Sequence, residues 1–478
     1  MEFWGRHREL ATLRAELDEV RASGRGRMLA VRGRRQAGKS RLLTELVETT
    51  ALPYVYATAV KNAPAPVQVA QVAEDMRTSR VPLPELEPAF AAPPTSWRDL
   101  LARLPLALGG QPAVVVLDEF PWATETDDTL EGVLQAAWDR TLERLPVLMV
   151  LVGSDLAMME RLTEHDRPLY GRAREMVVSA LSPAGVAEAF AGHVDPTAVF
   201  DLYLATGGYP RLVSAARPYT SVHGYVVEQL QDDQSPLSVT GLRMLDAEFR
   251  DAERARSVLE AIGSVEVGHA TFSSAVTQLG GDESSSGTAV SRALPALVHG
   301  KQVVAIDLPV GASPKSKLRR YRIVDPYLRF WFRYCRPHLA DMARGRADLA
   351  VGRFERDFPS WRGTAIEPVV REAVSRLATS DARLGDVERV GAWWDRSNQH
   401  EFDVVGAVRD GSVPLLGTVK WRTRTPVTAA EVGALAEGRA VVPGAASARL
   451  LAICPAGSQR DAGADVILGA TELLGAFR

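Results

Sequence analysis

The feature that most constrains this chain is one glycine-bounded run near the N-terminus, Gly33-Arg34-Arg35-Gln36-Ala37-Gly38-Lys39-Ser40. It fits the pattern G-x-x-x-x-G-K-[ST], follows an apolar stretch and precedes a helical one that opens at Arg41. The glycines let backbone N–H groups surround a phosphate, Lys39 reaches the β- and γ-phosphates, and Ser40 offers a hydroxyl to Mg²⁺. We therefore expect residues 33–41 to bind ATP together with Mg²⁺.

Two adjacent carboxylates, Asp118 and Glu119, follow the apolar run 113–117. Ligands of open parallel sheets bind at the carboxyl ends of strands, so both side chains are expected beside the phosphate loop. Asp118 is expected to hold Mg²⁺, and Glu119 to polarise the water that attacks the γ-phosphate. Ser154 follows another apolar run, 147–153, and has two interpretations: it orients that water, or it caps the next helix.

Length and composition describe a folded protein of several domains. The chain has 478 residues, 46% of them hydrophobic and 24% charged, which suits about three globular domains. The net charge of −3 confines any nucleic-acid site to a local surface. The two cysteines, Cys335 and Cys454, lie too far apart along the chain to suggest a disulfide framework or a zinc site, and no apolar run approaches the ~20 residues of a membrane helix. We expect a cytoplasmic protein that does not enter membranes.

The pattern of apolar residues divides the chain into four parts. Residues 1–182 alternate apolar strands with helices, which predicts an α/β P-loop NTPase core with a parallel sheet. Residues 183–245 read as a helical lid. Residues 246–340 contain three helices and then two short strands, which is the outline of a winged helix. Residues 341–478 form a separate small α/β domain.

The N-terminal part, to about Val213, resembles the archaeal and bacterial AAA+-like ATPases of the STAND group. The shared motifs are the phosphate loop, Phe3-Trp4-Gly5-Arg6, Leu117-Asp118-Glu119-Phe120-Pro121-Trp122, Val152-Gly153-Ser154, Pro168-Leu169-Tyr170-Gly171-Arg172 and Thr206-Gly207-Gly208-Tyr209-Pro210-Arg211. The resemblance implies that Arg172 acts at the nucleotide and that Arg211 is a further candidate. Residues 321–334 resemble the start of a C-terminal domain of unknown function attached to these ATPases.

The loop between the two short strands of the winged helix is basic. Residues 313–322 hold five basic side chains and no acidic one, namely Lys315, Lys317, Arg319, Arg320 and Arg322. Such a loop can follow a phosphate backbone while the preceding helix, 284–299, faces the major groove. A surface for a protein partner or a second copy of the chain explains the same charge. That helix carries few basic residues, which argues against strong sequence readout.

The last part resembles a restriction-endonuclease-like core of the PD-(D/E)XK type. In that resemblance Glu367 lies on a helix, Glu401 and Asp403 share one face of a strand, and Lys420 shares a face of the next strand with Thr418. Nucleases of this kind hold Mg²⁺ with carboxylates from neighbouring strands. Thr418 stands where a carboxylate is expected, with Glu401 as a substitute, so a fold without cleavage is favoured.

Two hypotheses about function follow from these motifs. The first is an ATPase switch that hydrolyses MgATP and associates with DNA through the winged helix. The second is an effector that binds or cleaves DNA and uses the nucleotide as a structural or regulatory ligand. The second predicts a steep dependence of DNA binding on salt.

Overall fold

A computed structural model describes residues 3–249, 253–280 and 282–478, which separate into two compact units, 1–180 and 181–478. The division lies near the boundary expected at residue 182. The three domains expected beyond that boundary belong to one unit. Over the described ranges, no helix combines the length and the apolar character needed to cross a bilayer.

The first unit is built on a parallel sheet with strand order β2-β3-β4-β1-β5. Its strands are β1 (Arg27–Arg32), β2 (Tyr54–Thr58), β3 (Ala113–Asp118), β4 (Val147–Gly153) and β5 (Ala173–Val177). The central strands β3 and β4 are buried along their whole length, as their continuous apolar sequence predicts. This confirms the α/β fold class with its parallel sheet.

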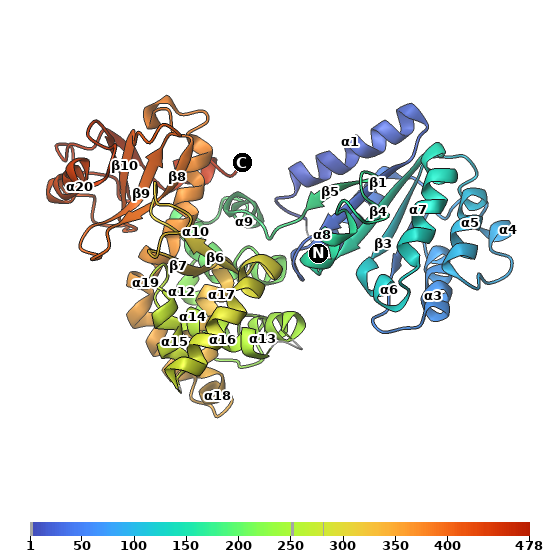
Figure 1. Cartoon of the computed structure of the whole chain (residues 1–478), viewed down its shortest axis with the longest axis horizontal. Coiled ribbons are helices and arrows are strands. Elements are labelled where there is room, and N and C mark those ends of the chain that lie inside the picture. The colour runs from blue at the N-terminus through green and yellow to red at the C-terminus, as the bar shows by residue number, and fades with distance from the viewer. Residues whose placement is uncertain (1–2, 250–252, 281) are drawn as a thin grey trace. The chain divides into compact units, whose positions relative to one another are not determined.

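Helices cover both faces of this sheet (Figure 1). One face packs against α1 (His7–Ser23) and α2 (Lys39–Thr50). The helices on the other face and at its edges are α3 (Ala65–Arg77), α4 (Leu86–Ala89), α5 (Trp97–Leu108), α6 (Phe120–Thr126), α7 (Leu130–Arg140) and α8 (Leu156–Leu162). Neighbouring residues of β1 take opposite sides, with Met28 in one core and Leu29 in the other.

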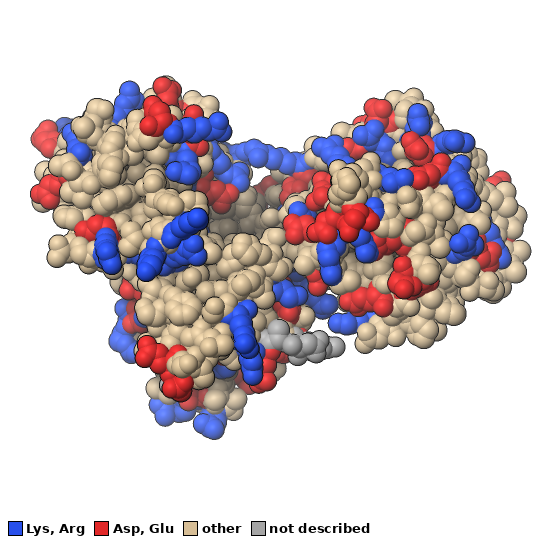
Figure 2. All heavy atoms as spheres, in the orientation of Figure 1, with Lys and Arg blue, Asp and Glu red and all other residues tan. Residues whose placement is uncertain are grey.

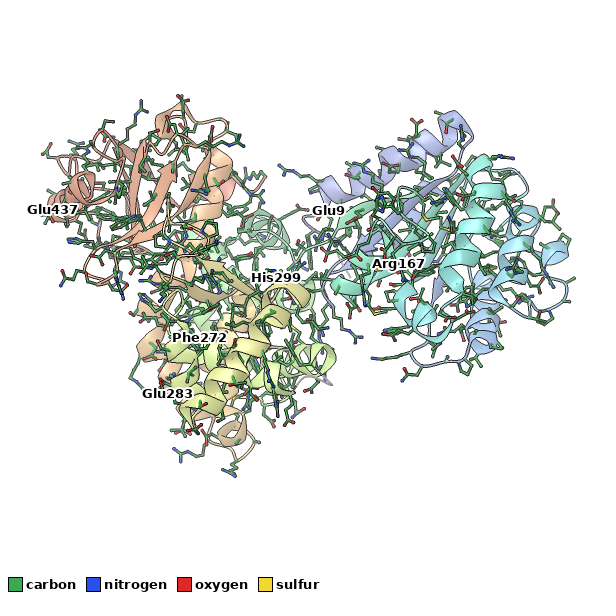
Figure 3. All side chains as sticks on the ribbon, viewed as in Figure 1. Glu9, Arg167, Phe272, Glu283, His299 and Glu437 are labelled. Carbon is green, nitrogen blue, oxygen red and sulfur yellow. The ribbon has the colours of Figure 1, made fainter. Side chains whose placement is uncertain are left out.

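The second unit begins with helices and continues into a three-helix group. The first helices are α9 (Pro183–Ala189), α10 (Pro196–Thr206), α11 (Pro210–Ala216), α12 (Val222–Leu230) and α13 (Pro236–Glu248). Then α14 (Glu253–Ser264), α15 (Phe272–Leu279) and α16 (Glu283–Pro295) pack on one another. Figure 3 labels Glu283, the first residue of α16, and His299, in the following helical turn η2 (Ala296–Gly300). The antiparallel hairpin β6 (Val304–Asp307) and β7 (Arg320–Ile323) completes this segment.

An aromatic helix joins this segment to the rest of the unit. This helix, α17 (Pro326–Tyr334), buries Phe330 and Tyr334 against Phe354 and Trp361 of the long helix α19 (Ala347–Leu377). Two short helical turns, η3 (Arg336–His338) and α18 (Leu339–Met342), lie between them. The aromatic spacing of α17 therefore serves packing.

Residues 389–468 contain a second, mixed sheet with strand order β12-β11-β10-β9-β8. Its strands are β8 (Arg389–Trp394), β9 (Glu401–Ala407), β10 (Leu415–Val419), β11 (Arg449–Ile453) and β12 (Val466–Leu468), with helices α20 (Ala429–Val441) and α21 (Ala470–Gly475). On the face drawn in Figure 2, basic and acidic side chains are interspersed, in keeping with the net charge of −3.

Candidate functional site

The phosphate loop connects β1 to α2, at the carboxyl edge of the first sheet. Two of its positions have positive φ, 63° at Gln36 and 95° at Gly38, and Gly38 directly precedes α2. Gly33 has no room for a side chain, because a Cβ atom there would lie 2.1 Å from the carbonyl oxygen of Val178. The glycines of the motif are therefore needed for the path of the loop.

Lys39 is the buried cation of this loop. Its side chain is 6% exposed, and its ammonium donates to the carbonyl oxygens of Gly33 (2.7 Å) and Arg34 (3.1 Å). Burial lowers the pKa of Lys39, while the negative charges of Glu119 and Asp118 oppose that shift. A compact cation thus lies at the phosphate loop, where both carboxylates act on its charge.

Asp118 accepts hydrogen bonds from three groups. Ser40 Oγ and the Tyr56 hydroxyl each donate to Oδ2 over 2.8 Å, and the backbone N–H of Glu119 donates to Oδ1 over 2.9 Å. Hydroxyl and carboxylate oxygens are ligands of the type that Mg²⁺ prefers. Ser40 and Asp118 therefore fit the metal role expected of them. Tyr56, on the neighbouring strand β2, was not expected from the sequence.

The carboxylate of Glu119 accepts hydrogen bonds from Ser154, the residue that follows β4. The backbone of Glu119 has φ 52° and ψ 38°, a left-handed conformation uncommon outside glycine. Its Oε2 accepts from Ser154 Oγ (2.9 Å) and Ser154 N (3.3 Å). The helix cap expected of Ser154 is instead made by Asp155, which accepts from the N–H of Met158. Ser154 therefore positions the candidate base, and the capping interpretation is wrong.

Three other residues of the range 33–41 have structural partners: Arg35, Ala37 and Arg41. The guanidinium of Arg35 lies 5.6 Å from the ring centre of Trp122, and Arg41 pairs with Glu45 at 2.7 Å. Ala37 is buried, and its carbonyl oxygen accepts from Arg6 over 2.6 Å. Arg6 also donates to the carbonyl oxygen of Ser179, so it ties the loop to the chain that follows β5. The sequence placed Arg6 in a family motif without predicting this contact.

Arg172 lies at the amino ends of the parallel strands, whereas the phosphate loop lies at their carboxyl ends. Its neighbour Ala173 pairs with Met28 at the start of β1, whereas the loop begins after Arg32 at the other end. At 3.3 Å per residue, the two ends of the strand lie about 13 Å apart. The guanidinium makes two hydrogen bonds to Asp139, at 2.7 and 2.8 Å. In its own chain Arg172 is therefore bonded away from the phosphate loop, and its action at a nucleotide stays a prediction.

Arg211 belongs to the second unit, at the start of α11, and its role at the nucleotide stays a prediction. The preceding turn has a structural role within that unit. Gly207 and Gly208 have φ of 61° and 72°, and a Cβ atom on Gly208 would lie 2.0 Å from the carbonyl oxygen of Leu181. Tyr209 then donates its hydroxyl to Asp325 at the start of α17.

Of the nuclease-like carboxylates, Glu401 and Glu367 are paired with arginines, whereas the Asp403 carboxylate accepts from β10. Glu401 accepts two hydrogen bonds from the buried Arg320, at 2.6 and 3.1 Å. Asp403 accepts from Val419 N (2.7 Å) and Thr418 Oγ (3.1 Å). Within the described ranges, no three His, Cys, Asp or Glu side chains gather as metal ligands. None of these contacts supports a nuclease metal site built on Glu401, and the nuclease-like site stays a prediction.

Glu367 lies near Asp403 but is bound to its own helix. Arg371 donates to Glu367 over 3.3 Å and to the carbonyl oxygen of Asp403 over 2.9 Å. Burial, and then the charge of Asp403, raise the pKa of Glu367 to about 8. Lys420 is half-buried on the chain after β10, and its charge acts on Asp403. This cluster resembles a buried polar core more than a reaction centre.

The basic loop of the hairpin is partly neutralised. Arg320 pairs with Glu401 and lies 4.1 Å from the ring centre of Trp394, and Arg322 makes two hydrogen bonds to Asp307. The backbone of Val310 is bonded to Ala392 of β8. Only Lys315 and Lys317 of the five basic residues are fully exposed. The loop therefore contacts the second sheet with one side and presents two lysines to solvent.

Comparison with known protein families gives two matches, one within the first unit and one within the second. Residues 2–150 match the family described as AAA ATPase domain, and residues 331–432 match a family described as archaea bacterial proteins of unknown function. An uncharacterized protein of Methanocaldococcus jannaschii is 23% identical over 427 residues, 88% of each chain.

Solved structures similar to this chain include two archaeal proteins. The Walker-type ATPase of Pyrococcus abyssi aligns with a TM-score of 0.45 and 18% identity, over 69% of this chain and 96% of its own. The ORC2 protein of Aeropyrum pernix aligns with a TM-score of 0.41 and 16% identity, over 73% of this chain and 95% of its own. The phosphate loop, the acidic strand end and the match of residues 2–150 agree in making the first unit similar to a P-loop ATPase domain.

Proposed function

We propose that this protein hydrolyses MgATP and uses the hydrolysis as a conformational switch that acts on residues 181–478. The observation that carries this proposal is the placement of Glu119, whose carboxylate Ser154 holds next to the Ser40–Asp118 pair. A bound Mg²⁺ would neutralise charge on the phosphates, with Ser40 and Asp118 as its protein ligands.

In this proposal each residue of the site has one task. Lys39 binds the β- and γ-phosphates, and its position between the loop carbonyls and the two carboxylates supports that role. Glu119 accepts the proton of the attacking water, and Ser154 keeps its carboxylate in one orientation. The loop backbone and the amino end of α2 supply further partial positive charge.

Phosphate release from MgATP by the purified protein tests this assignment. Lys39→Ala is expected to abolish nucleotide binding. Glu119→Gln is expected to bind nucleotide normally and to turn over about 10²- to 10⁴-fold more slowly, because a general base is lost. The matched control is Glu125→Gln, an exposed glutamate of α6, which should turn over as the unaltered protein does. Unchanged turnover in Glu119→Gln would show that another group acts as the base.

We further propose that the three-helix group and its hairpin associate with DNA. Support comes from the arrangement of α14, α15 and α16 with an antiparallel hairpin, and from the exposed Lys315 and Lys317 at its tip. With Arg320 and Arg322 already paired, we expect few phosphate contacts and therefore a shallow dependence of affinity on salt.

Mobility shifts with duplex DNA at several salt concentrations test the DNA proposal. Removing a lysine that contacts phosphate should reduce the salt slope by about 1, so Lys315→Gln and Lys317→Gln should each flatten it. Lys61→Gln, at an exposed position of the first unit, is the matched control. If no shift occurs at low salt, the lysines serve a protein partner or a second copy instead.

A further inference from the structure

The second unit contains an open cavity of about 240 Å³ that the ATPase proposal does not use. Its walls come from the end of α14 and the following loop, from β7, from α17 and from α19. Six charged residues line it: Arg322, Arg329, Arg333, Arg356, Glu266 and Asp357. With four arginines against two carboxylates, the lining carries a net positive charge.

Two of these arginines are neutralised by carboxylates. Arg322 makes two hydrogen bonds to Asp307, at 2.7 and 3.1 Å, and Arg333 bonds to Asp357 at 2.6 Å. The Nε of Arg333 is nevertheless buried without a hydrogen-bond partner. The cavity wall therefore retains an unused donor even at a paired arginine.

Arg329 is the unusual residue of this cavity. It is 5% exposed, and among the described residues it forms no ion pair. One Nη donates to the carbonyl oxygen of Ala365 over 3.1 Å, whereas its Nε is buried and unpartnered. Burial, and then the charge of Arg322, lower the pKa of Arg329 to about 9. The charges of Asp325 and Asp307 act on Arg329 in the opposite direction, but neither of these two described carboxylates makes an ion pair with it. A buried cation without a direct ion pair is costly, so the site favours an anion.

Arg356 supplies a second uncompensated charge at the same cavity. It projects from α19, is exposed, and makes no hydrogen bond or ion pair within the described part of the chain. Glu266, the remaining acid of the lining, is exposed as well. Among the described residues, Arg329 and Arg356 are therefore the two lining arginines that form no ion pair.

We propose that this cavity binds a small phosphorylated ligand, with its phosphate between Arg329 and Arg356. A phosphate matches two guanidinium groups in charge, and its oxygens accept charge-assisted hydrogen bonds from their N–H donors. An adjoining cavity of about 560 Å³ shares Val267, Gly268 and Arg322 with the first and has room for the rest of an organic phosphate. The site lies in residues 181–478 and is separate from the phosphate loop.

Calorimetric titration of the full chain with inorganic phosphate, at constant ionic strength in chloride, tests this proposal. The Lys39→Ala variant serves as the parent protein, because it removes phosphate binding at the P-loop and makes the result independent of the ATPase proposal. We expect saturable binding in the parent that weakens about 10-fold or more when Arg329→Met or Arg356→Gln is added, since each removes charge-assisted hydrogen bonds. Arg346→Gln, at an exposed arginine outside the cavity, should bind as the parent does.

The two variants also control for folding. Arg329→Met replaces a buried, unpaired cation with an apolar chain, so its melting temperature without phosphate should equal or exceed that of the parent. If this variant does not fold, the exposed Arg356→Gln carries the test alone. Adenosine monophosphate as a second titrant distinguishes a phosphate monoester, which would bind more tightly than phosphate, from phosphate itself. No binding by the parent, or equal binding by both arginine variants, would overturn the proposal.

Discussion

At the residue scale, one hydrogen bond of Asp118 could be predicted from the sequence motifs and another could not. The contact with Ser40 could be predicted, because both positions belong to patterns with known places on a parallel sheet. The contact with Tyr56 could not, because it depends on the register of β2 against β3, which aligns Thr58 with Asp118. Ser154 was ambiguous for a similar reason, since its neighbour Asp155 can cap the helix equally well.

Tyr56 is expected to position Asp118 for the metal. Tyr56→Phe removes one hydrogen bond to a charged group, so we expect turnover about 10-fold lower and a higher Mg²⁺ concentration at half-maximal rate. ATP binding without Mg²⁺ should not change. Tyr54→Phe, on the same strand but with its hydroxyl at Arg80, is the matched control. If the two variants gave identical Mg²⁺ titrations, Tyr56 would have no role in positioning Asp118 for the metal.

Glu367 is expected to make the second unit less stable as pH rises. Its folded-state pKa of about 8 lies above the ordinary glutamate value, so folding favours the protonated acid. That stabilisation is complete below about pH 4 and is lost as pH rises through about 8. Glu367→Gln stays neutral, so its melting temperature should fall less between about pH 5 and about pH 9.

Thermal unfolding followed by circular dichroism over that pH range measures the effect. Glu372→Gln, on the same helix but paired with Arg376 at the surface, should keep the pH dependence of the unaltered protein. Parallel curves for Glu367→Gln and the unaltered protein would mean that Glu367 is already ionised in the fold.

Among the elements of the first sheet, the buried strands could be predicted from the sequence, whereas the exposed edge strand could not. The strands β1, β3 and β4 are apolar because the sheet covers them, and an apolar run marks each of them in the sequence. The fifth, β5, is an edge strand with exposed arginine and glutamate side chains, and nothing in its pattern marks it as a strand. The charge of the hairpin loop was likewise overestimated, because Glu401, the partner of Arg320, lies 81 residues away.

At the scale of the whole molecule, the predicted lid and the predicted tail turn out to be parts of one unit. Asp201 of α10 pairs with Arg362 of α19 at 2.5 Å and accepts from the indole of Trp421 at 3.2 Å. These residues lie in segments predicted as separate domains. A polar contact between distant segments leaves no periodic pattern in the sequence, whereas a buried strand does.

The position of Arg172 leads to a prediction about assembly. Because it lies at the sheet edge opposite the phosphate loop of its own chain, any action on a nucleotide requires a second copy. Arg172→Ala and Lys39→Ala should then each be inactive alone, yet turnover should return when the two proteins are mixed. The first variant supplies an intact phosphate loop in such a pair, and the second supplies the arginine.

Phosphate release from the mixture, measured over a range of protein concentrations, tests this prediction. The recovered rate should rise more steeply than in proportion to concentration, because only associated copies are active. Arg140→Ala, which changes a nearby arginine at the end of α7, should turn over without mixing and so controls for the loss of a surface charge. If Arg172→Ala alone retains full turnover, Arg172 serves only its pair with Asp139, and the arginine that meets the phosphate must come from another element.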